Sequence, residues 1–261
     1  DDINSEIKKG SPFTVRLKTP KEGKTSFQDL IYGNISVENN EIDDFIIVRS
    51  DGSPVYNLTN VVDDSTMEIT HVIRGEDHVS NTPKQILIYR ALGFKVPIFA
   101  HLPMILGEDK KRLSKRHGAA GVNEYESMGY QPDALLNYLA FLGWNPGTEE
   151  EIFDLGGLVR NFDIKKVQKK SATYDQKKFN WISSQHLMKE DSKKVLNRLA
   201  IIDPEWGESI RQDYFIKIIN LMKPRSNSLT DLINQSKYFF FSSPKKFDST
   251  QLKRIWKQDT T

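Results

Sequence analysis

Residues 69–106 read ITHVIRGEDHVSNTPKQILIYRALGFKVPIFAHLPMIL, and this stretch decides the fold of the first half of the chain. Its apolar ends, residues 69–73 and 97–106, predict two strands. Residues 83–92, which lie between these strands, predict a helix. A strand, a helix and a strand in this order predict a parallel β-α-β unit, because parallel strands need a long crossover connection.

The helix of this unit has recognisable ends. Thr82 is a suitable N-cap, and Gln85, three residues later, completes a capping box with it. Pro83 suits the first helical position, and Gly93 ends the helix. These signals place the helix at residues 83–92.

A polar cluster follows each strand of this unit. Residues 74–78 (RGEDH) come directly after the first strand, and residues 107–118 follow the second. Sheets of this kind bind ligands beyond the carboxyl ends of their strands. We therefore expect both clusters to lie at the same edge of the sheet, where a ligand would bind.

Three segments before this unit also predict strands, because they are short, rich in β-branched or aromatic residues and separated by turn residues. These segments are residues 13–18, 31–37 and 42–49. A turn at residues 50–54 (SDGSP) follows them. Residues 55–62 (VYNLTNVV) then predict a strand or a buried loop.

Beyond residue 120 the apolar periodicity changes to that of helices. Pro132 begins a helix whose apolar residues recur at helical spacing as far as Leu142, and Gly143 ends it. Further helices are predicted at residues 150–160, 191–201, 208–223 and 228–240. The fold class is therefore α/β in the first part and all-α afterwards, which favours two or more domains.

The composition limits the class of protein. The chain has 261 residues, of which 38% are hydrophobic, and this is enough to build a packed core. It contains no cysteine, which excludes disulfides, thiolate metal sites and cysteine nucleophiles. No long apolar run and no signal peptide are found, so a cytoplasmic protein without a membrane partner is expected. Because the sequence does not start with Met, we expect that its first residue is not the natural N-terminus.

The net charge of +2 hides a division along the sequence. Residues 1–159 contain 16 Lys or Arg and 24 Asp or Glu, a net charge of −8. Residues 160–261 contain 21 Lys or Arg and 11 Asp or Glu, a net charge of +10. The basic half is either an ordinary solvated surface or a surface that binds a polyanion such as a nucleic acid.

Residues 110–118 (KKRLSKRHG) form the strongest local pattern. Composition alone favours a solvated basic loop. Three features favour a phosphate site instead: the loop follows a predicted parallel strand, Gly107 and Gly118 flank it, and Ser114 lies between its cations. Lys and Arg side chains in such a loop can neutralise the charge of phosphate groups.

Within this loop, residues 112–116 (RLSKR) resemble the KMSKS signature of class I aminoacyl-tRNA synthetases, in the KLSKR form common in glutamyl-tRNA synthetases. Other segments resemble that family in the same order and with the same spacing. They are residues 56–64 (YNLTNVVDD), 71–78 (HVIRGEDH), 80–83 (SNTP) and 101–105 (HLPMI). The resemblance covers nearly the whole chain, and the chain is identified as a member of the glutamyl-tRNA synthetase family.

Two departures from the family pattern bear on activity. The family's H-x-G-H motif, which binds ATP, is absent, because none of the 5 histidines forms it. We therefore expect that the amino-terminal half of the nucleotide fold is missing, with its glutamate-binding residues, and that the chain alone is inactive. Arg112 stands where the signature has its first Lys, which keeps the charge, although Arg and Lys are not strictly interchangeable.

The resemblance implies that three residues bind glutamate. Arg74 is expected to bind the side-chain carboxylate through two parallel hydrogen bonds, which would select the acid over its neutral amide. Without the resemblance, a salt bridge with Glu76 or Asp77 is the favoured role of Arg74. Tyr56 and Asn60 are expected to line the pocket, and the alternative for Tyr56 is an ordinary core tyrosine.

The resemblance also implies an ATP site. Lys115 is expected to contact the ATP phosphates, with Ser114 and Arg112 as the other catalytic residues of the loop. The expected ATP-binding residues are Lys115, Asp77, Met104 and Ile105. The last two are expected to flank the adenine, although core packing is the alternative for Met104.

No metal site is expected among the residues of this chain. ATP is expected as its Mg²⁺ complex, in which the phosphates hold the metal. Asp63 and Asp64 are adjacent, and adjacent residues on a strand point to opposite faces, so they are not expected to share a ligand. A structural role at a turn is expected for this pair.

The family fold implies four parts of the chain. Residues 1–43 are expected to end the inserted acceptor-stem-binding domain, and residues 44–115 to form the second half of the Rossmann-like catalytic domain. Residues 116–190 are expected to form the helical stem-contact domain, and residues 191–261 to begin the helical anticodon-binding region.

The reaction implied is ATP-dependent ligation of L-glutamate to tRNA(Glu) through glutamyl-adenylate, by a monomer whose partners are tRNA(Glu), L-glutamate and ATP. One alternative is the truncated paralogue that attaches glutamate to a modified tRNA base, but the helices predicted after residue 190 argue against it. The other is a non-catalytic RNA-binding module, which an H-x-G-H motif upstream of residue 1 would exclude. Charging of tRNA(Gln) stays open, because anticodon discrimination is expected to lie largely beyond residue 261.

Overall fold

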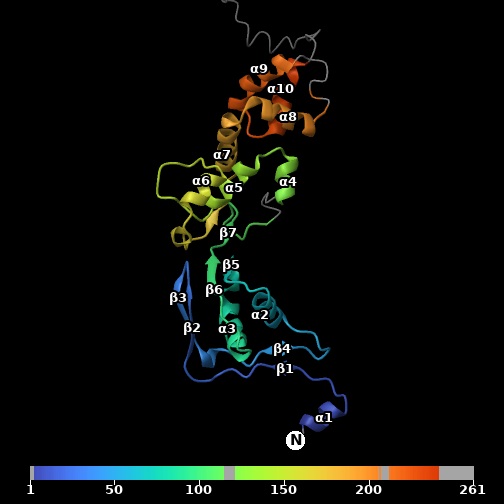
Figure 1. The fold of residues 1–261 in the computed structure, drawn as a ribbon, viewed down its shortest axis with the longest axis vertical. Coiled ribbons are helices and arrows are strands. Elements are labelled where there is room, and N and C mark those ends of the chain that lie inside the picture. The colour runs from blue at the N-terminus through green and yellow to red at the C-terminus, as the bar shows by residue number, and fades with distance from the viewer. Residues whose placement is uncertain (1–2, 115–120, 205, 207–211, 241–261) are drawn as a thin grey trace, which may run out of the picture. The chain divides into compact units, whose positions relative to one another are not determined.

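A computed structural model describes residues 3–114, 121–204, 206 and 212–240 (Figure 1). The chain divides into two compact units. The first comprises Asp1–His117, Ala140–Glu149 and Val159–Tyr174, and the second comprises Gly118–Leu139, Glu150–Leu158 and Asp175–Thr261. Each unit has a hydrophobic core of its own.

A four-stranded mixed sheet forms the centre of the first unit, in the order β3-β2-β6-β5. β2 (Lys24–Asp29) and β3 (Gly33–Glu38) form an antiparallel hairpin. β6 (Ile98–Leu102) runs parallel to β2 and to β5 (His71–Gly75). α3 (Thr82–Ala91) connects β5 to β6, so the predicted parallel β-α-β unit is confirmed.

The core of the first unit lies between this sheet and two neighbouring helices, α3 and α2 (Tyr56–Thr66) (Figure 1). Its buried apolar side chains come from β2, α2, α3 and β6: Phe27, Val61, Ile86, Ile88, Tyr89 and Phe99. Packing of these side chains fixes the carboxyl ends of β5 and β6 relative to the start of α3.

Smaller elements complete the first unit. α1 (Ile3–Lys8) precedes β1 (Val15–Arg16), which pairs antiparallel with β4 (Ile46–Val48). β7 (Ile105–Leu106) pairs parallel with β8 (Ala172–Thr173). Among this unit's described residues, the short 3-10 helices are η1 (Asn39–Glu41), η2 (Glu76–Asn81) and η4 (Ile164–Lys166).

The prediction of a strand or a buried loop at residues 55–62 was wrong, because α2 covers most of this segment. Val55 has an extended backbone and occupies the N-cap position of the helix. Leu58 and Val61 are three residues apart and both pack into the core, as helical spacing requires. Val61 and Val62 favour strands by propensity, and this preference concealed the helical spacing.

Three strand predictions also need correction. Residues 97–106 form two strands, because Pro103 has no N–H and separates β6 from β7. The segments 13–18 and 42–49 contain only the short strands β1 and β4. β2 was not predicted, because Phe27 is its only large apolar residue, although its residues alternate between exposed and buried positions.

Among the described residues of the second unit, the regular structure is helical. The helices are α4 (Val122–Ser127), α7 (Gln176–Lys189), α8 (Ser192–Ile202), α9 (Gln212–Met222), η5 (Lys223–Arg225), α10 (Leu229–Ser236) and η6 (Lys237–Phe239). α5 (Pro132–Phe141) and α6 (Leu155–Asn161) contribute residues to both units. The helix predicted from Pro132 is confirmed, whereas the helix predicted at 150–160 begins only at Leu155.

Side-chain caps begin three helices of the second unit. Asp175, Asp191 and Ser228 accept backbone hydrogen bonds at the starts of α7, α8 and α10. Apolar side chains from α8, α9 and α10, including the fully buried Leu199 and Leu232, form the core there. No helix in the described part of the chain is both long and apolar enough to cross a membrane.

Candidate functional site

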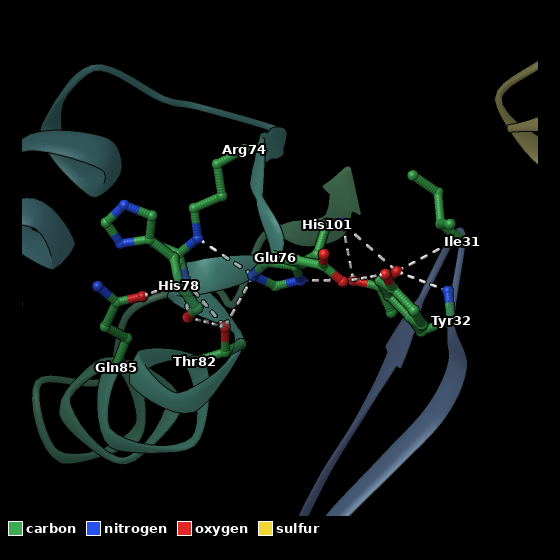
Figure 2. Close-up of polar contacts among 9 residues, drawn as sticks. Ile31, Tyr32, Arg74, Glu76, His78, Thr82, Gln85 and His101 are labelled. Carbon is green, nitrogen blue, oxygen red and sulfur yellow. Dashed lines mark hydrogen bonds and ion pairs between the residues drawn. The ribbon is translucent and has the colours of Figure 1, made fainter. Parts of the chain in front are cut away.

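Arg74 lies at the carboxyl end of β5, beside His101 of β6 in the parallel register. Its side chain is half-buried, and three side chains surround the guanidinium (Figure 2). Nε donates to Nε2 of His101 at 3.2 Å, and Nη2 donates to Thr82 Oγ1 and to Gln85 Oε1, both at 2.8 Å. None of these acceptors is a carboxylate, so they solvate the charge of Arg74 without neutralising it.

The structure contradicts the alternative that Arg74 forms a salt bridge with Glu76 or Asp77. Glu76 accepts hydrogen bonds from the Tyr32 hydroxyl and from the backbone N–H of Met104, the latter at 2.8 Å. Asp77 forms an ion pair with a different arginine. Both carboxylates therefore have other partners.

One nitrogen of Arg74 is left over. Nη1 is buried and has no hydrogen-bond partner within the described ranges. The two hydrogens of Nη2 are matched by Thr82 and Gln85, so a ligand would meet the donors on Nη1. An unpaired buried donor on a charged group is costly, and burial already lowers the pKa of the Arg74 guanidinium. This position therefore suits an anionic ligand.

Thr82 and Gln85 bind Arg74 and do not form the predicted capping box. α3 begins at Thr82 itself, and Asn81 at the N-cap position makes no capping hydrogen bond with its side chain. Thr82 and Gln85 are almost fully buried. A buried guanidinium without acceptors would cost more free energy than an uncapped helix end, which explains this use of the two side chains.

The same network reaches α2. Gln85 Nε2 donates to Asn60 Oδ1 at 2.9 Å and to Asn57 Oδ1 at 3.2 Å. Asn60 is therefore connected to Arg74 through a single intervening side chain. The structure brings these two predicted substrate-binding residues together, although they come from different elements.

Tyr56, the first residue of α2, is 50% exposed, so the alternative of an ordinary core tyrosine is wrong. Its hydroxyl lies 3.4 Å from Nδ1 of His78, and the centroids of the two rings are 5.9 Å apart. The backbone oxygen of His78 also accepts a long hydrogen bond from Arg74 Nη2, at 3.5 Å. Tyr56 is thus linked to Arg74 through His78.

Behind Arg74, His101 forms a buried pair with Asp29. Nδ1 of His101 lies 2.6 Å from Oδ2 of Asp29, and neither side chain has exposed surface. Oδ1 of Asp29 accepts the backbone N–H groups of Ile31 and Tyr32, both at 2.9 Å. Burial lowers the pKa of His101, and the neighbouring Asp29 opposes this effect.

The Asp29–His101 pair was not predicted from the sequence. Asp29 ends a polar strand that was not predicted, and His101 lies in an apolar segment where a lone histidine carries no signal of its own. In the structure residues 24–29 alternate between exposed and buried positions, which places Asp29 on the buried face of the sheet, but in the sequence only Phe27 marks that face.

Two of the residues predicted to bind ATP follow β6. Met104 is half-buried in the break between β6 and β7, and Ile105 begins β7. The hydrogen bond from the Met104 backbone to Glu76 ties this break to η2. Burial and the bond to Glu76 both raise the pKa of Tyr32, so its hydroxyl remains a donor at neutral pH.

Only the first part of the signature loop lies within the described residues. A tight turn closes residues 107–111 through a backbone hydrogen bond of 2.8 Å. Nη1 of Arg112 lies 3.2 Å from Oδ2 of Asp77, which connects the loop to η2. Ser114 is half-buried, and Lys115 lies outside the described residues.

Asp63 and Asp64 lie on α2 and not on a strand. Asp63 is exposed, whereas Asp64 accepts a hydrogen bond from the Tyr89 hydroxyl at 3.4 Å, and burial raises the pKa of Asp64. In the part of the chain that the structure describes, no group of three or more His, Asp or Glu side chains is arranged to hold a metal ion.

Comparison with known proteins gives consistent matches. The family model "tRNA synthetases class I (E and Q), catalytic domain" matches residues 1–181. The chain is 42% identical to Glutamate–tRNA ligase 1 of Caldanaerobacter subterraneus subsp. tengcongensis, over 100% of this chain and 54% of that relative. It is 45% identical to the glutamate–tRNA ligase of Aquifex aeolicus, over 89% of this chain and 50% of that relative. The chain thus spans about half the length of the curated relatives it matches.

A solved structure matches as well. The crystal structure of a glutamate tRNA ligase from Elizabethkingia meningosepticum, in complex with its amino acid, has a TM-score of 0.88 and 33% sequence identity to this chain. The match covers 99% of this chain and 55% of that one, so it includes both the mixed sheet and the helices.

Proposed function

The chain belongs to the class I tRNA synthetases for glutamate and glutamine, and from this premise we propose that it serves the ATP-dependent ligation of L-glutamate to tRNA(Glu). In the first step the α-carboxylate of glutamate attacks the α-phosphorus of ATP, and pyrophosphate leaves. In the second step a hydroxyl of the terminal ribose of tRNA attacks the glutamyl-adenylate, and AMP leaves. Neither step needs a covalent enzyme intermediate, so the protein acts by positioning its substrates and neutralising charge.

The observation that carries this proposal is the state of Arg74. Its guanidinium is charged and half-buried, it is held by uncharged side chains, and its buried Nη1 has no partner among the described residues. A glutamate side-chain carboxylate at Nη1 would supply the missing acceptor and a directly paired negative charge, in addition to the charge of Asp64 that already acts on Arg74. Because Nη2 already serves Thr82 and Gln85, we propose binding through Nη1 rather than through both terminal nitrogens.

Tyr56 and Asn60 are proposed to complete the glutamate pocket. The Oδ1 atom of Asn60 accepts from Gln85, and this directs its Nδ2 donors to the other side of the amide. The Tyr56 hydroxyl is exposed near His78 and can donate to the substrate. These neutral donors add hydrogen bonds to the carboxylate, whereas discrimination against glutamine depends on the charge of Arg74.

ATP is proposed to bind as its Mg²⁺ complex beside the glutamate. We assign Lys115, Ser114 and Arg112 to the phosphates, where cations stabilise the charge that develops on pyrophosphate. Met104 and Ile105 are assigned to the adenine. The ion pair between Asp77 and Arg112 supports a position of the loop close to η2. Because η2 closely follows Arg74 in the sequence, the loop would also lie close to Arg74.

tRNA is the proposed partner of the basic second half, whose net charge between residues 160 and 261 is +10. The domain boundaries at residues 43, 115 and 190, a monomeric state and a cytoplasmic location remain part of this proposal. The presence of α8, α9 and α10 after residue 190 favours the tRNA ligase over the truncated paralogue, which lacks a helical anticodon-binding region.

We further propose that catalysis needs the family's H-x-G-H motif in addition to this chain, because the chain corresponds to 54% and 50% of two relatives. A protein that contains both segments is called the complete enzyme below. The test is glutamate-dependent ATP–pyrophosphate exchange in the presence of tRNA.

We expect exchange by the complete enzyme and none by the 261-residue chain. Exchange by the chain alone would contradict the requirement for the motif. Tight tRNA binding by the complete enzyme without any exchange would favour the non-catalytic RNA-binding module.

A further inference from the structure

His101 lies between two groups on which the proposed site depends. Its Nε2 is 3.2 Å from Nε of Arg74 (Figure 2). Its Nδ1 is 2.6 Å from Oδ2 of Asp29. We propose that Asp29 and His101 are positioning residues, which hold the Arg74 guanidinium so that Nη1 faces the substrate carboxylate. This inference rests on the proposed role of Arg74 in glutamate binding.

The contacts of His101 determine which of its nitrogens carries the proton. A guanidinium offers only donors, so Nε2 must accept the hydrogen bond from Arg74 and cannot carry a hydrogen. A carboxylate offers only acceptors, so Nδ1 must donate to Asp29. The imidazole is therefore neutral, with its proton on Nδ1. Burial, which lowers the pKa of His101, favours the same neutral state.

Asp29 is held in place by the backbone. Its Oδ1 accepts the N–H groups of Ile31 and Tyr32, which follow β2, and its Oδ2 accepts the N–H of His101 at 3.1 Å. Rotation of this buried carboxylate would leave several donors unpaired. The orientation of the His101 ring, and of the acceptor that it presents to Arg74, is therefore set by the hairpin and β6.

Three contacts define the plane of the Arg74 guanidinium. His101 holds Nε, while Thr82 and Gln85 hold Nη2. Because the group is planar, Nη1 then has a fixed direction. Loss of the contact at Nε leaves the group held at one nitrogen only, so Nη1 is no longer presented to the carboxylate at a fixed position.

Asp29 acts on Arg74 only through the tautomer of His101. A His101 ring with its proton on Nε2, or with both nitrogens protonated, would place an N–H against the N–H of Arg74. The N–H of Arg74 would then be unpaired, while the ring N–H could turn only to Thr82 Oγ1, which lies 3.1 Å from Nε2. The Asp29 carboxylate excludes the first of these forms because it requires the proton on Nδ1.

Two substitutions of His101 separate its two contacts. In His101→Asn, the amide reaches the position of Nδ1, so a donor to Asp29 is kept and the acceptor for Arg74 is lost. In His101→Gln, the longer amide reaches the position of Nε2, so an acceptor for Arg74 is kept and the donor to Asp29 is lost. Asp29→Asn tests the remaining link, because an amide permits the tautomer with its proton on Nε2.

The readouts in the complete enzyme are kcat/KM for glutamate, kcat/KM for glutamine and KM for ATP. We expect His101→Asn and Asp29→Asn to lower the ratio of kcat/KM for glutamate to kcat/KM for glutamine by about ten- to a hundredfold. This is the range for a lost hydrogen bond to a charged group. His101→Gln should lower this ratio less than His101→Asn does. KM for ATP should be unchanged in all three variants.

A second measurement does not depend on activity. Nitrogen-15 shifts of the His101 ring, measured in the 261-residue chain, should show the proton on Nδ1, and in Asp29→Asn they should show it on Nε2. A proton on Nε2 in the unmodified chain would overturn the inference. The inference would also be overturned if kcat/KM fell equally for glutamate and glutamine in both His101 variants and the melting temperature was lower. That result would show a structural role only. Failure of the proposed function is recognised separately, since the unmodified complete enzyme would then not prefer glutamate.

Discussion

Two regions of the molecule bury side chains of opposite character. The Arg74 network, made of Asp29, Arg74, Thr82, Gln85 and His101, places polar groups beside the sheet, and all of them except Arg74 are at most 1% exposed. The α8–α10 core consists of the buried apolar side chains of helices α8, α9 and α10 with their neighbours. Of its helices, α8 and α10 begin with side-chain caps, Asp191 and Ser228, which satisfy backbone donors.

From this difference we expect the α8–α10 core to determine stability and the Arg74 network to determine specificity. Burial of apolar groups is favourable by itself, so the α8–α10 core stabilises the fold directly. Burial of polar groups is favourable only when each of them is paired, and the Arg74 network pairs its groups around the Arg74 guanidinium, which keeps an unfilled donor. We therefore expect substitutions in the core to change the free energy of unfolding, and substitutions in the network to change substrate selection.

The largest effect on stability is expected from Leu232→Ala in the α8–α10 core. Leu232 is fully buried, and the substitution removes apolar contacts and leaves a cavity, which costs about 2–5 kcal/mol of the free energy of unfolding. Denaturant unfolding of the 261-residue chain measures this loss. The control is Leu221→Ala in α9, whose side chain is 51% exposed and whose loss should cost less than about 0.5 kcal/mol.

In the complete enzyme, Leu232→Ala should leave the ratio of kcat/KM for glutamate and glutamine unchanged at a temperature where the variant is folded. A change of this ratio would remove the distinction between the two regions, because the core would then contribute to selection as well.

A smaller effect, which depends on pH, is expected from His186 in α7. Burial lowers its pKa below the ordinary value of about 6.5, and the charged groups that affect it are Asp133, Asp154 and Lys189. As the pH falls below about 6.5, the unfolded chain binds a proton that the folded chain does not bind. The free energy of unfolding should therefore decrease with falling pH, by at most about 1.4 kcal/mol per pH unit for this residue.

His186→Gln isolates this contribution. His186 Nε2 lies 3.0 Å from Asn137 Oδ1, and a Gln amide can donate the same hydrogen bond without titrating. The difference in the free energy of unfolding between the two proteins should be constant above about pH 7. At lower pH it should shift in favour of the variant, which does not lose stability through this residue. Identical pH dependence in both proteins would contradict the assignment of a buried neutral His186.

The sequence predicted those parts of the fold in which pattern and burial agree. The β5-α3-β6 unit combines apolar strands with a helix between them, and its parallel pairing is confirmed. The helix beginning at Pro132 also follows its apolar periodicity. The prediction failed at residues 55–62, where β-branched residues favour a strand and only the core contact of Leu58 and Val61 shows the helix.

The candidate site could be predicted only in part, because its supporting residues are polar groups with ordinary local roles. Thr82 and Gln85 match a capping box, and nothing in their spacing indicates that a buried arginine uses both side chains instead. Asp29 and His101 are 72 residues apart in the sequence and meet only because their strands are neighbours in the sheet. Because β2 was not predicted, this contact could not be predicted either. Arg74 itself was indicated by resemblance to the family and by its expected position just after a strand, although β5 extends to Gly75 and includes it.

Arg74→Ala in the complete enzyme tests whether Arg74 selects a carboxylate. Its effect on stability should be smaller than that of Leu232→Ala, since the guanidinium is only half-buried. Loss of the charge-assisted pair should lower kcat/KM for glutamate by a factor equivalent to on the order of 2–5 kcal/mol. Because glutamine gains little from the charge, kcat/KM for glutamine should fall much less.

The measurement is the ratio of kcat/KM for glutamate to kcat/KM for glutamine, together with the melting temperature. Arg90→Ala is the matched control, because Arg90 is exposed on α3. We expect the ratio to fall toward one in Arg74→Ala and to stay at the unmodified value in Arg90→Ala. An unchanged ratio in Arg74→Ala, with equal losses for both substrates and a lower melting temperature, would contradict the claim and assign Arg74 a structural role.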